Sequence, residues 1–203
     1  MATIEALYRI HFNEDNDPFE FFSVQQGVDC TGPAWGCHYC EGGWMMNVMA
    51  YIIHNKGVCW DKDYPYKNRR TACAASKCTN AFTFDKYRDV SGHTGQTLAK
   101  HIAVNPLAIA VSSATREFMY YKSGIITKCG NAQVDHAVNA VAYSTTNAIP
   151  HMIGRNSWSE RWGDNGAFRI ALAGNACKWR SNVSYPVLTT PPKSLRHPQT
   201  PAI

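Results

Sequence analysis

The residues best suited to chemistry are a histidine and an asparagine twenty positions apart, each next to an apolar run. His136 precedes Ala137–Tyr143, and Asn156 lies two positions before Trp158. An imidazole can act as a general base, and an asparagine amide can accept a hydrogen bond from one ring N–H and so fix the tautomer. A neighbouring tryptophan can keep water away from that bond. We therefore predict that His136, Asn156 and Trp158 form the base, the orienting group and the shield of a nucleophilic site.

The second half of the chain has the pattern of a β-rich unit. One helix is predicted over Thr94–Val104, ending before Pro106. Short apolar runs separated by turn residues are typical of an antiparallel sheet or barrel. The predicted strands are Ala108–Val111, Ala137–Tyr143, Met152–Gly154 and Ala167–Leu172.

The first half has helical periodicity instead. Apolar residues recur at helical spacing over Met1–Ile10 and again from Trp44 to the stop signal Asn55–Gly57. The fold class is therefore α+β, with a helical lobe over residues 1–88, a β-rich lobe over residues 89–188 and a tail over residues 189–203. Four prolines in that tail indicate disorder.

Composition excludes several classes of protein. The 203 residues are 45% hydrophobic and 17% charged, which is ordinary for a folded domain and unlike a disordered chain. No run approaches the roughly 20 apolar residues of a membrane-spanning helix. The net charge of +5 is scattered, with one tight basic run at Lys67–Arg70, so we expect a solvated surface and no nucleic-acid partner.

Several further motifs, in order along the chain, resemble the papain-like cysteine peptidases. They cover about residues 3 to 187. The matching segments are Ser23–Cys30, Cys40–Gly43, Asp63–Tyr66 with Cys73, Asp135–Ala137, Asn156–Trp158 with Trp162–Gly166, and Ser184–Pro186. The resemblance implies a two-lobe fold with a barrel-like second lobe, an incomplete first lobe, and peptide-bond hydrolysis by a thiolate paired with His136. It implies a peptide or protein substrate, a monomer, no cofactor and no metal.

The family's nucleophilic cysteine motif, Gln-Gly-x-Cys-Gly-Ser-Cys-Trp, is not found in this sequence. Met1–Ile10 resembles the later part of the helix that this cysteine begins, so the resemblance places the nucleophile before Met1. Thr3 would lie roughly 12 Å along the helix from that point, too far to replace it. We therefore expect no peptidase activity from this chain alone.

The eight cysteines are too many for an ordinary reduced protein. The resemblance suggests the disulfides Cys30–Cys73 and Cys129–Cys177, and Cys59 and Cys78 are placed to form a third. The remaining pair, Cys37 and Cys40, either bond to each other, stay free or, with His38 between them, hold a metal or act in redox chemistry.

The resemblance also implies a peptide-binding cleft. Gly42 and Gly43 would pair with the backbone of an extended peptide. The main specificity pocket would be lined by Trp44, Met45, Ala110, Val134 and Asn182, with Asp135 beside it. Its mostly apolar walls favour a bulky apolar side chain.

The sequence is compatible with two functions. In the first, the chain is part of an ordinary peptidase that is secreted or lysosomal or vacuolar, with an upstream signal. In the second, Met1 is the true start, and the product is a cytoplasmic pseudoenzyme that binds peptides or a partner protein.

Overall fold

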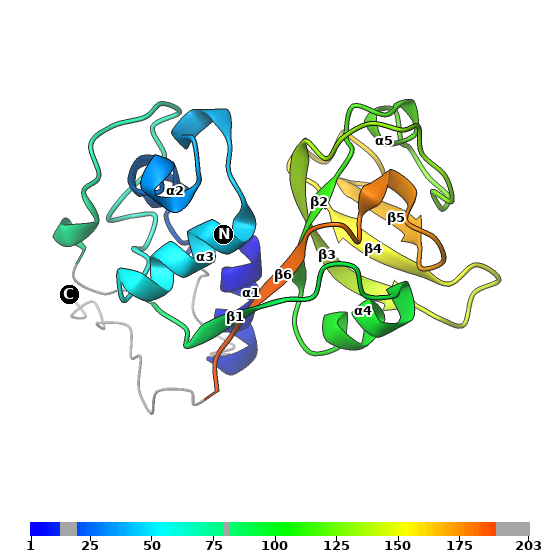
Figure 1. Ribbon diagram of the computed structural model, residues 1–203, viewed down its shortest axis with the longest axis horizontal. Coiled ribbons are helices and arrows are strands. Elements are labelled where there is room, and N and C mark those ends of the chain that lie inside the picture. The colour runs from blue at the N-terminus through cyan, green and yellow to red at the C-terminus, as the bar shows by residue number, and fades with distance from the viewer. Residues whose placement is uncertain (13–19, 79–81, 190–203) are drawn as a thin grey trace, which may run out of the picture.

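The computed structural model describes residues 1–12, 20–78 and 82–189. Figure 1 shows the helices α1, α2 and α3 gathered on one side and most of the sheet, with α4 and α5, on the other. The predicted disorder of the tail falls almost wholly on residues 190–203, outside the described residues. Within the described residues, no helix is long and apolar enough to cross a membrane.

In residues 1–12, 20–78 and 82–88, the first lobe contains three α-helices and three short 3-10 helices. The α-helices are α1 (Ala2–His11), α2 (Val24–Cys30) and α3 (Met45–His54); the 3-10 helices are η1 (Pro33–Trp35), η2 (Tyr39–Glu41) and η3 (Ala75–Lys77). The start of α2 is fixed by Ser23, whose hydroxyl accepts a hydrogen bond from the N–H of Gln26 at 2.9 Å. In α1, Ile4 and Leu7 face inward and are almost fully buried.

Aromatic side chains form the centre of this lobe. Phe22 is fully buried and stacks on Phe82 with the ring centroids 5.3 Å apart. Tyr8 of α1 meets both rings edge-on, at 5.6 and 5.2 Å. Pairs in this geometry add to the stabilisation from burial alone, so α1 is anchored to the lobe by its aromatic face.

The described part of the chain forms one sheet of six strands in the order β1-β6-β2-β3-β4-β5, and each neighbouring pair is antiparallel. The strands are β1 (Lys86–Asp89), β2 (Leu107–Val111), β3 (His136–Ser144), β4 (His151–Arg155), β5 (Ala167–Ala171) and β6 (Val183–Val187). Helices α4 (Gly95–Ile102) and α5 (Arg116–Met119) and the 3-10 helix η4 (Ala176–Lys178) lie between them in the chain. Every residue of β2 is buried, which explains its continuous apolar run.

The elements predicted from periodicity are present, with ends that differ by one or two residues. Helix α4 begins after Thr94, whose side chain accepts from the N–H of Thr97 at 3.2 Å. The sequence did not indicate α2, α5, β1 or β6. The predicted lobe boundary after residue 88 falls inside β1, which pairs with β6 as both strands run between the two parts (Figure 1). The division into lobes at that residue stays a prediction.

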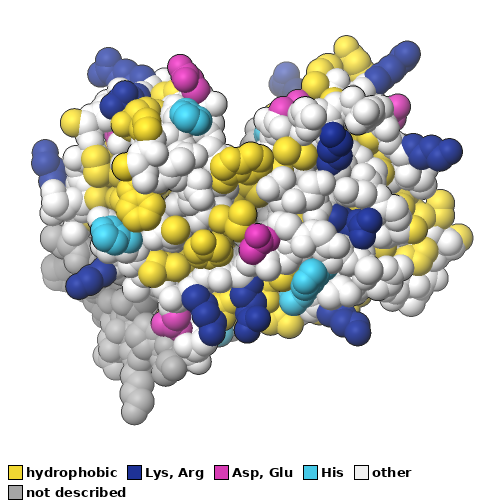
Figure 2. Space-filling view, viewed as in Figure 1, with side chains coloured by type: hydrophobic (Ala, Val, Ile, Leu, Met, Phe, Trp, Pro, Cys, Tyr) yellow, Lys and Arg dark blue, Asp and Glu magenta, His cyan; other side chains and the backbone are white. Residues whose placement is uncertain are grey.

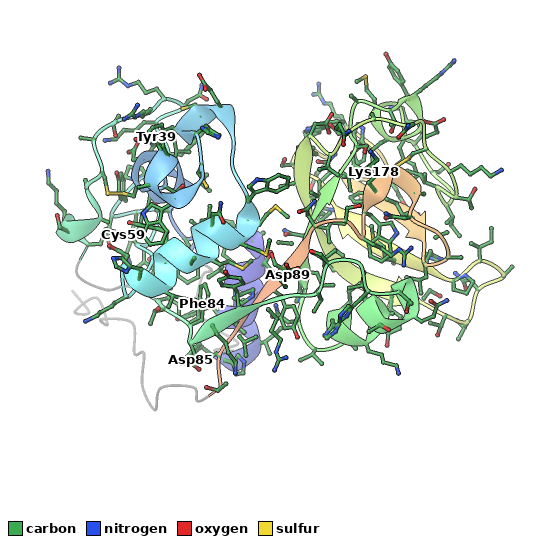
Figure 3. All side chains as sticks on the ribbon, viewed as in Figure 1. Tyr39, Cys59, Phe84, Asp85, Asp89 and Lys178 are labelled. Atoms are coloured by element: carbon green, nitrogen blue, oxygen red, sulfur yellow. A yellow bond between two sulfur atoms is a disulfide. The ribbon has the colours of Figure 1, made fainter. Side chains whose placement is uncertain are left out.

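Three disulfides close loops of the fold. They join Cys30 to Cys73, Cys59 to Cys78 and Cys129 to Cys177, the pairs expected from the sequence (Figure 3). The thiols of Cys37 and Cys40 are free, the first buried and the second exposed.

Candidate active site

The strand β3 carries His136 at its first position. His136 lies opposite Val111, the last residue of the buried strand β2, and Ala137 lies opposite Ala110. After His136, the alternate residues Val138 and Ala140 of β3 are buried in the hydrophobic core of the β-rich lobe. The histidine is therefore held at the end of a rigid element, with a half-buried side chain.

The imidazole of His136 is hydrogen-bonded to Asn156, with 2.8 Å between Nε2 and Oδ1. The same oxygen accepts the backbone N–H of Ser157 at 2.8 Å, which fixes the orientation of the amide. Since Oδ1 can only accept, Nε2 carries the proton and Nδ1 is left as the basic nitrogen. The Nδ2 atom of Asn156 is buried and has no partner within the described residues.

Trp158 covers this pair. Its ring is stacked on the imidazole of His136, with centroids 4.9 Å apart and planes inclined by 27°. Phe118 of α5 and Trp162 hold the indole edge-on, at 5.8 and 5.4 Å. The three residues predicted from the sequence are thus brought together, whereas the supporting Phe118 carried no sequence signal.

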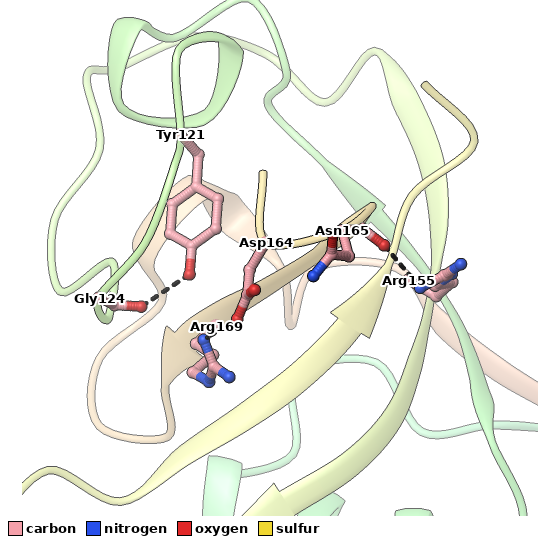
Figure 4. A network of polar contacts seen from close by, with 6 residues as sticks. All are labelled: Tyr121, Gly124, Arg155, Asp164, Asn165 and Arg169. Carbon is pink, nitrogen blue, oxygen red and sulfur yellow. Dashed lines mark hydrogen bonds and ion pairs between the residues drawn. The ribbon is translucent and has the colours of Figure 1, made fainter. Parts of the chain in front are cut away.

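The turn between β4 and β5 that carries Asn156 and Trp158 is tied down by polar contacts (Figure 4). Arg155 donates to the carbonyl oxygen of Asn165 at 2.8 Å. Arg169 forms an ion pair with Asp164 at 2.8 Å, and this contact raises the pKa of the guanidinium. These contacts limit the motion of the turn.

Asp135, which we expected at the substrate pocket, also has a structural contact. Its carboxylate accepts the backbone N–H groups of Ser113 at 2.6 Å and Ala114 at 3.2 Å. Burial raises the pKa of Asp135, but these hydrogen bonds and the nearby His136 outweigh it, so the pKa lies below the ordinary value. Through these bonds the ionised carboxylate of Asp135, the residue before His136, is tied to the segment after β2.

A cleft of about 500 Å³ lies between the two lobes. Figure 2 shows a hollow between the two parts with hydrophobic side chains at its floor. The first lobe contributes Gly42, Gly43, Trp44 and Met45, all predicted as cleft residues, together with the beginning of α1. Asn156 and Ser157 line the opposite wall, so the His136–Asn156 pair borders the cleft.

Three residues predicted for the specificity pocket do not line this cleft. Ala110 is buried within β2, and its N–H donates to the carbonyl oxygen of Asn182 at 3.0 Å. Asn182 and Val134 are half-buried. The structure therefore places Ala110 and Asn182 next to each other, outside the lining of this cleft, and their role in a specificity pocket stays a prediction.

No thiol is in contact with His136 within the described residues, which include all eight cysteines. Six of them form disulfides. Cys37 lies in the cleft wall, packed so closely on Gly43 that an added Cβ there would be 2.5 Å from its Sγ. The hydroxyl of Thr3 is buried and donates to Asn139 at 3.0 Å, joining α1 to β3. The described residues contain no cluster of three or more His, Cys, Asp or Glu side chains that could hold a metal ion.

Comparison with known proteins gives one consistent result. The family model described as "Papain family cysteine protease" matches residues 1–187. Zingipain-2 of Zingiber officinale is 34% identical over 169 residues, and a low-temperature-induced cysteine proteinase of Solanum lycopersicum is 37% identical over 175 residues. Among solved structures, the bromelain protease of Ananas comosus in complex with the E64 inhibitor superposes with a TM-score of 0.79 at 31% identity, covering 92% of this chain and 85% of that one.

The matched lengths differ among these relatives. The match covers 81% of this chain and 75% of zingipain-2, but 83% of this chain and only 50% of the Solanum proteinase. The chain thus spans about half to three quarters of these curated relatives.

Proposed function

Since the chain belongs to the papain family of cysteine proteases, we propose that His136, Asn156 and Trp158 are the base, the orienting amide and the shield for peptide-bond hydrolysis. The observation that carries this proposal is the 2.8 Å bond between Nε2 of His136 and Oδ1 of Asn156. It leaves Nδ1 free to accept a proton from a thiol.

The chemistry follows from that geometry. Nδ1 of His136 takes the thiol proton, which gives a thiolate–imidazolium pair. The thiolate attacks the peptide carbonyl carbon, and the imidazolium protonates the departing amine as the C–N bond breaks. Water, deprotonated by the same nitrogen, then hydrolyses the thioester, releasing the acid and restoring the thiol. Trp158 excludes water from the His136–Asn156 bond, which strengthens it.

We also propose that this chain by itself does not hydrolyse peptides. The contacts of His136 are to an amide and an indole. The free thiols of Cys37 and Cys40 lie in the segment before α3, Cys40 within η2. A working site needs a thiol presented to Nδ1 by a segment outside these 203 residues. The supporting geometry is that the cleft reaches the beginning of α1.

The test is hydrolysis of a fluorogenic peptide by two proteins. One is the chain as it stands; the other carries an upstream helical segment with the family's Gln-Gly-x-Cys-Gly-Ser-Cys-Trp motif. We expect activity only in the extended protein and its loss on His136→Ala. Activity of the unextended chain that disappears on Cys37→Ser or Cys40→Ser would refute the second proposal. A folded extended protein that stays inactive would refute the first.

A second candidate function is peptide binding without cleavage. The observation that favours it is the preserved cleft, with Gly42 and Gly43 beside the apolar Trp44 and Met45. Glycine backbone groups can pair with an extended peptide, and the apolar wall favours bulky apolar side chains. Calorimetry measures the affinity of the cleft for two short blocked peptides, one containing Leu or Phe and the other containing Asp. Equal affinity for the two peptides would contradict the preference for apolar side chains.

The three disulfides support the proposal that the protein folds in an oxidising compartment and is then secreted or delivered to a lysosome or vacuole. Expression with and without a secretion signal tests this. We expect three disulfides only in the exported protein, and full oxidation of cytosolic material would contradict the assignment.

A further inference from the structure

Two histidines lie side by side on the second lobe, away from the proposed active site. His93 precedes the N-cap of α4 and His101 lies in the last turn of that helix. Their ring centroids are 5.7 Å apart and the ring planes are inclined by 34°. We propose that His93 and His101 form a binding site for a divalent transition-metal ion that prefers imidazole ligands, Zn²⁺ or Cu²⁺.

The spacing of the rings suits a shared ion. A metal–nitrogen distance of about 2.0–2.1 Å places each ring centroid roughly 3.2 Å from the ion, so tetrahedral or trigonal angles separate the centroids by about 5.2–5.5 Å. The observed 5.7 Å needs an adjustment of a few tenths of an ångström. The exposed side chain of His93 can make it, because its imidazole has no hydrogen bond within the part of the chain that the structure describes.

His101 is already oriented in the way that ligating histidines are. Its Nδ1 lies 3.1 Å from the hydroxyl of Tyr185 on β6, a side chain that is 8% exposed. In the tautomer whose Nδ1–H donates to this oxygen, the Nε2 lone pair is free. Fixing the ring through its other nitrogen is the usual arrangement around protein-bound metals.

With two protein ligands, water completes the coordination, so this is a weaker site than a closed four-ligand one.

The charged groups around the pair set a limit on affinity. Arg88 lies opposite Tyr185 in the β1–β6 register, and Arg180 donates to the carbonyl oxygen of His93 at 3.1 Å. Lys100 is the neighbour of His101 on α4. The carboxylate of Asp89 on β1 accepts hydrogen bonds from the backbone N–H and the hydroxyl of Ser91. Because Arg88 repels a cation, Arg88→Gln should tighten metal binding while it leaves both ligands in place.

The test is titration with ZnCl₂ alone, followed by calorimetry and by NMR of the histidine side chains, with the exposed thiol of Cys40 alkylated beforehand. We expect His93→Gln or His101→Gln to weaken binding at least tenfold and Tyr185→Phe to weaken it about tenfold. The matched control is His54→Gln, an exposed histidine at the end of α3 whose ring packs on Trp35; it should leave the affinity unchanged. Circular dichroism confirms that each variant is folded.

Four results would overturn the proposal. The first three are the absence of Zn²⁺ binding that shifts the His93 and His101 resonances, an affinity unchanged in both glutamine variants, and weaker binding in Arg88→Gln. Tighter binding of sulfate than of Zn²⁺ at the same ionic strength would make the cluster an anion site and also refute it. Peptidase activity is not read out, so the outcome is independent of the proposed function.

Discussion

The buried carboxylate of Asp29 offers a sharp test of how the first lobe is held together. Asp29 is 5% exposed and is the last residue but one of α2, next to the Cys30–Cys73 disulfide. Its Oδ1 accepts from Nε2 of Gln25 at 2.9 Å and from the backbone N–H of Thr71, and its Oδ2 accepts from the hydroxyls of Tyr64 at 2.8 Å and Thr71 at 2.6 Å. We predict that Asp29→Asn destabilises the protein strongly.

The magnitude follows from these four bonds. In its best orientation an asparagine keeps Oδ1 toward the two N–H donors, whose directions are fixed. Its NH₂ group then takes the place of Oδ2 and cannot accept from the two hydroxyl groups. Hydrogen bonds to a charged group contribute about 1.5–3 kcal/mol each. Rotation of the hydroxyls recovers part of the loss, so we expect about 3 kcal/mol. In a domain of this size that lowers Tm by about 6–12 °C.

The same residue should also control stability in acid. Burial raises the pKa of Asp29, but the hydrogen bonds from Thr71, Gln25 and Tyr64 outweigh it and place the pKa below its ordinary value of 3.8. A depressed pKa contributes stability above the unfolded-state value, and that stability is lost as pH falls through the folded-state value. From about pH 5 downward, the natural protein should therefore lose more stability than Asp29→Asn.

The assay is urea unfolding followed by circular dichroism at several pH values. The matched control is Asp63→Asn, an exposed aspartate, which should change stability by less than about 0.5 kcal/mol. A loss below about 1 kcal/mol for Asp29→Asn at pH 7, or an unchanged acid dependence, would refute the reasoning.

Two further predictions concern the two lobes. Replacing both Cys30 and Cys73 by serine opens a loop of 43 residues, which by the loop-entropy relation costs about 4 kcal/mol; a Tm equal to that of the intact protein in non-reducing buffer would contradict this. Gly154→Ala should destabilise the sheet by at least 1 kcal/mol, because the added Cβ would lie 2.1 Å from the ring of Phe168. Gly27→Ala should be neutral or slightly stabilising, because Gly27 lies within α2 and its added Cβ would make only ordinary contacts, 3.6 Å from Met1 and 3.9 Å from Val48. Thermal unfolding of the two variants checks this, and equal effects would be inconsistent with the packing.

Local patterns predicted the long helices and the central strands. Ile4 and Leu7 follow the helical period because one face of α1 packs on the aromatic core. The continuous apolar run of β2 reflects burial on both faces. Strand β6 was missed because Pro186 and Ser184 weaken the strand pattern. Its extended conformation is stabilised instead by hydrogen-bonded pairing with β1 and β2, which local propensity does not reveal.

The site was predictable only in part, for a similar reason. His136, Asn156 and Trp158 were found from their types and spacing, and the structure brings them into contact. The lining of the cleft depends on how the two lobes pack, which no local pattern contains. A local pattern cannot show that Ala110 is buried in β2 while the exposed Trp44 lines the cleft.

The tautomer of the His136 ring, measured by ¹⁵N NMR on the chain as it stands, tests the proposed role of this residue most directly. We predict that the neutral ring carries its proton on Nε2 and a lone pair on Nδ1, because Oδ1 of Asn156 accepts from Nε2. Asn156→Ala should release this preference and give a mixture of tautomers, with the fold preserved. A proton on Nδ1 in the natural chain, or a tautomer unaffected by Asn156→Ala, would contradict the assignment of His136 as the base oriented by Asn156.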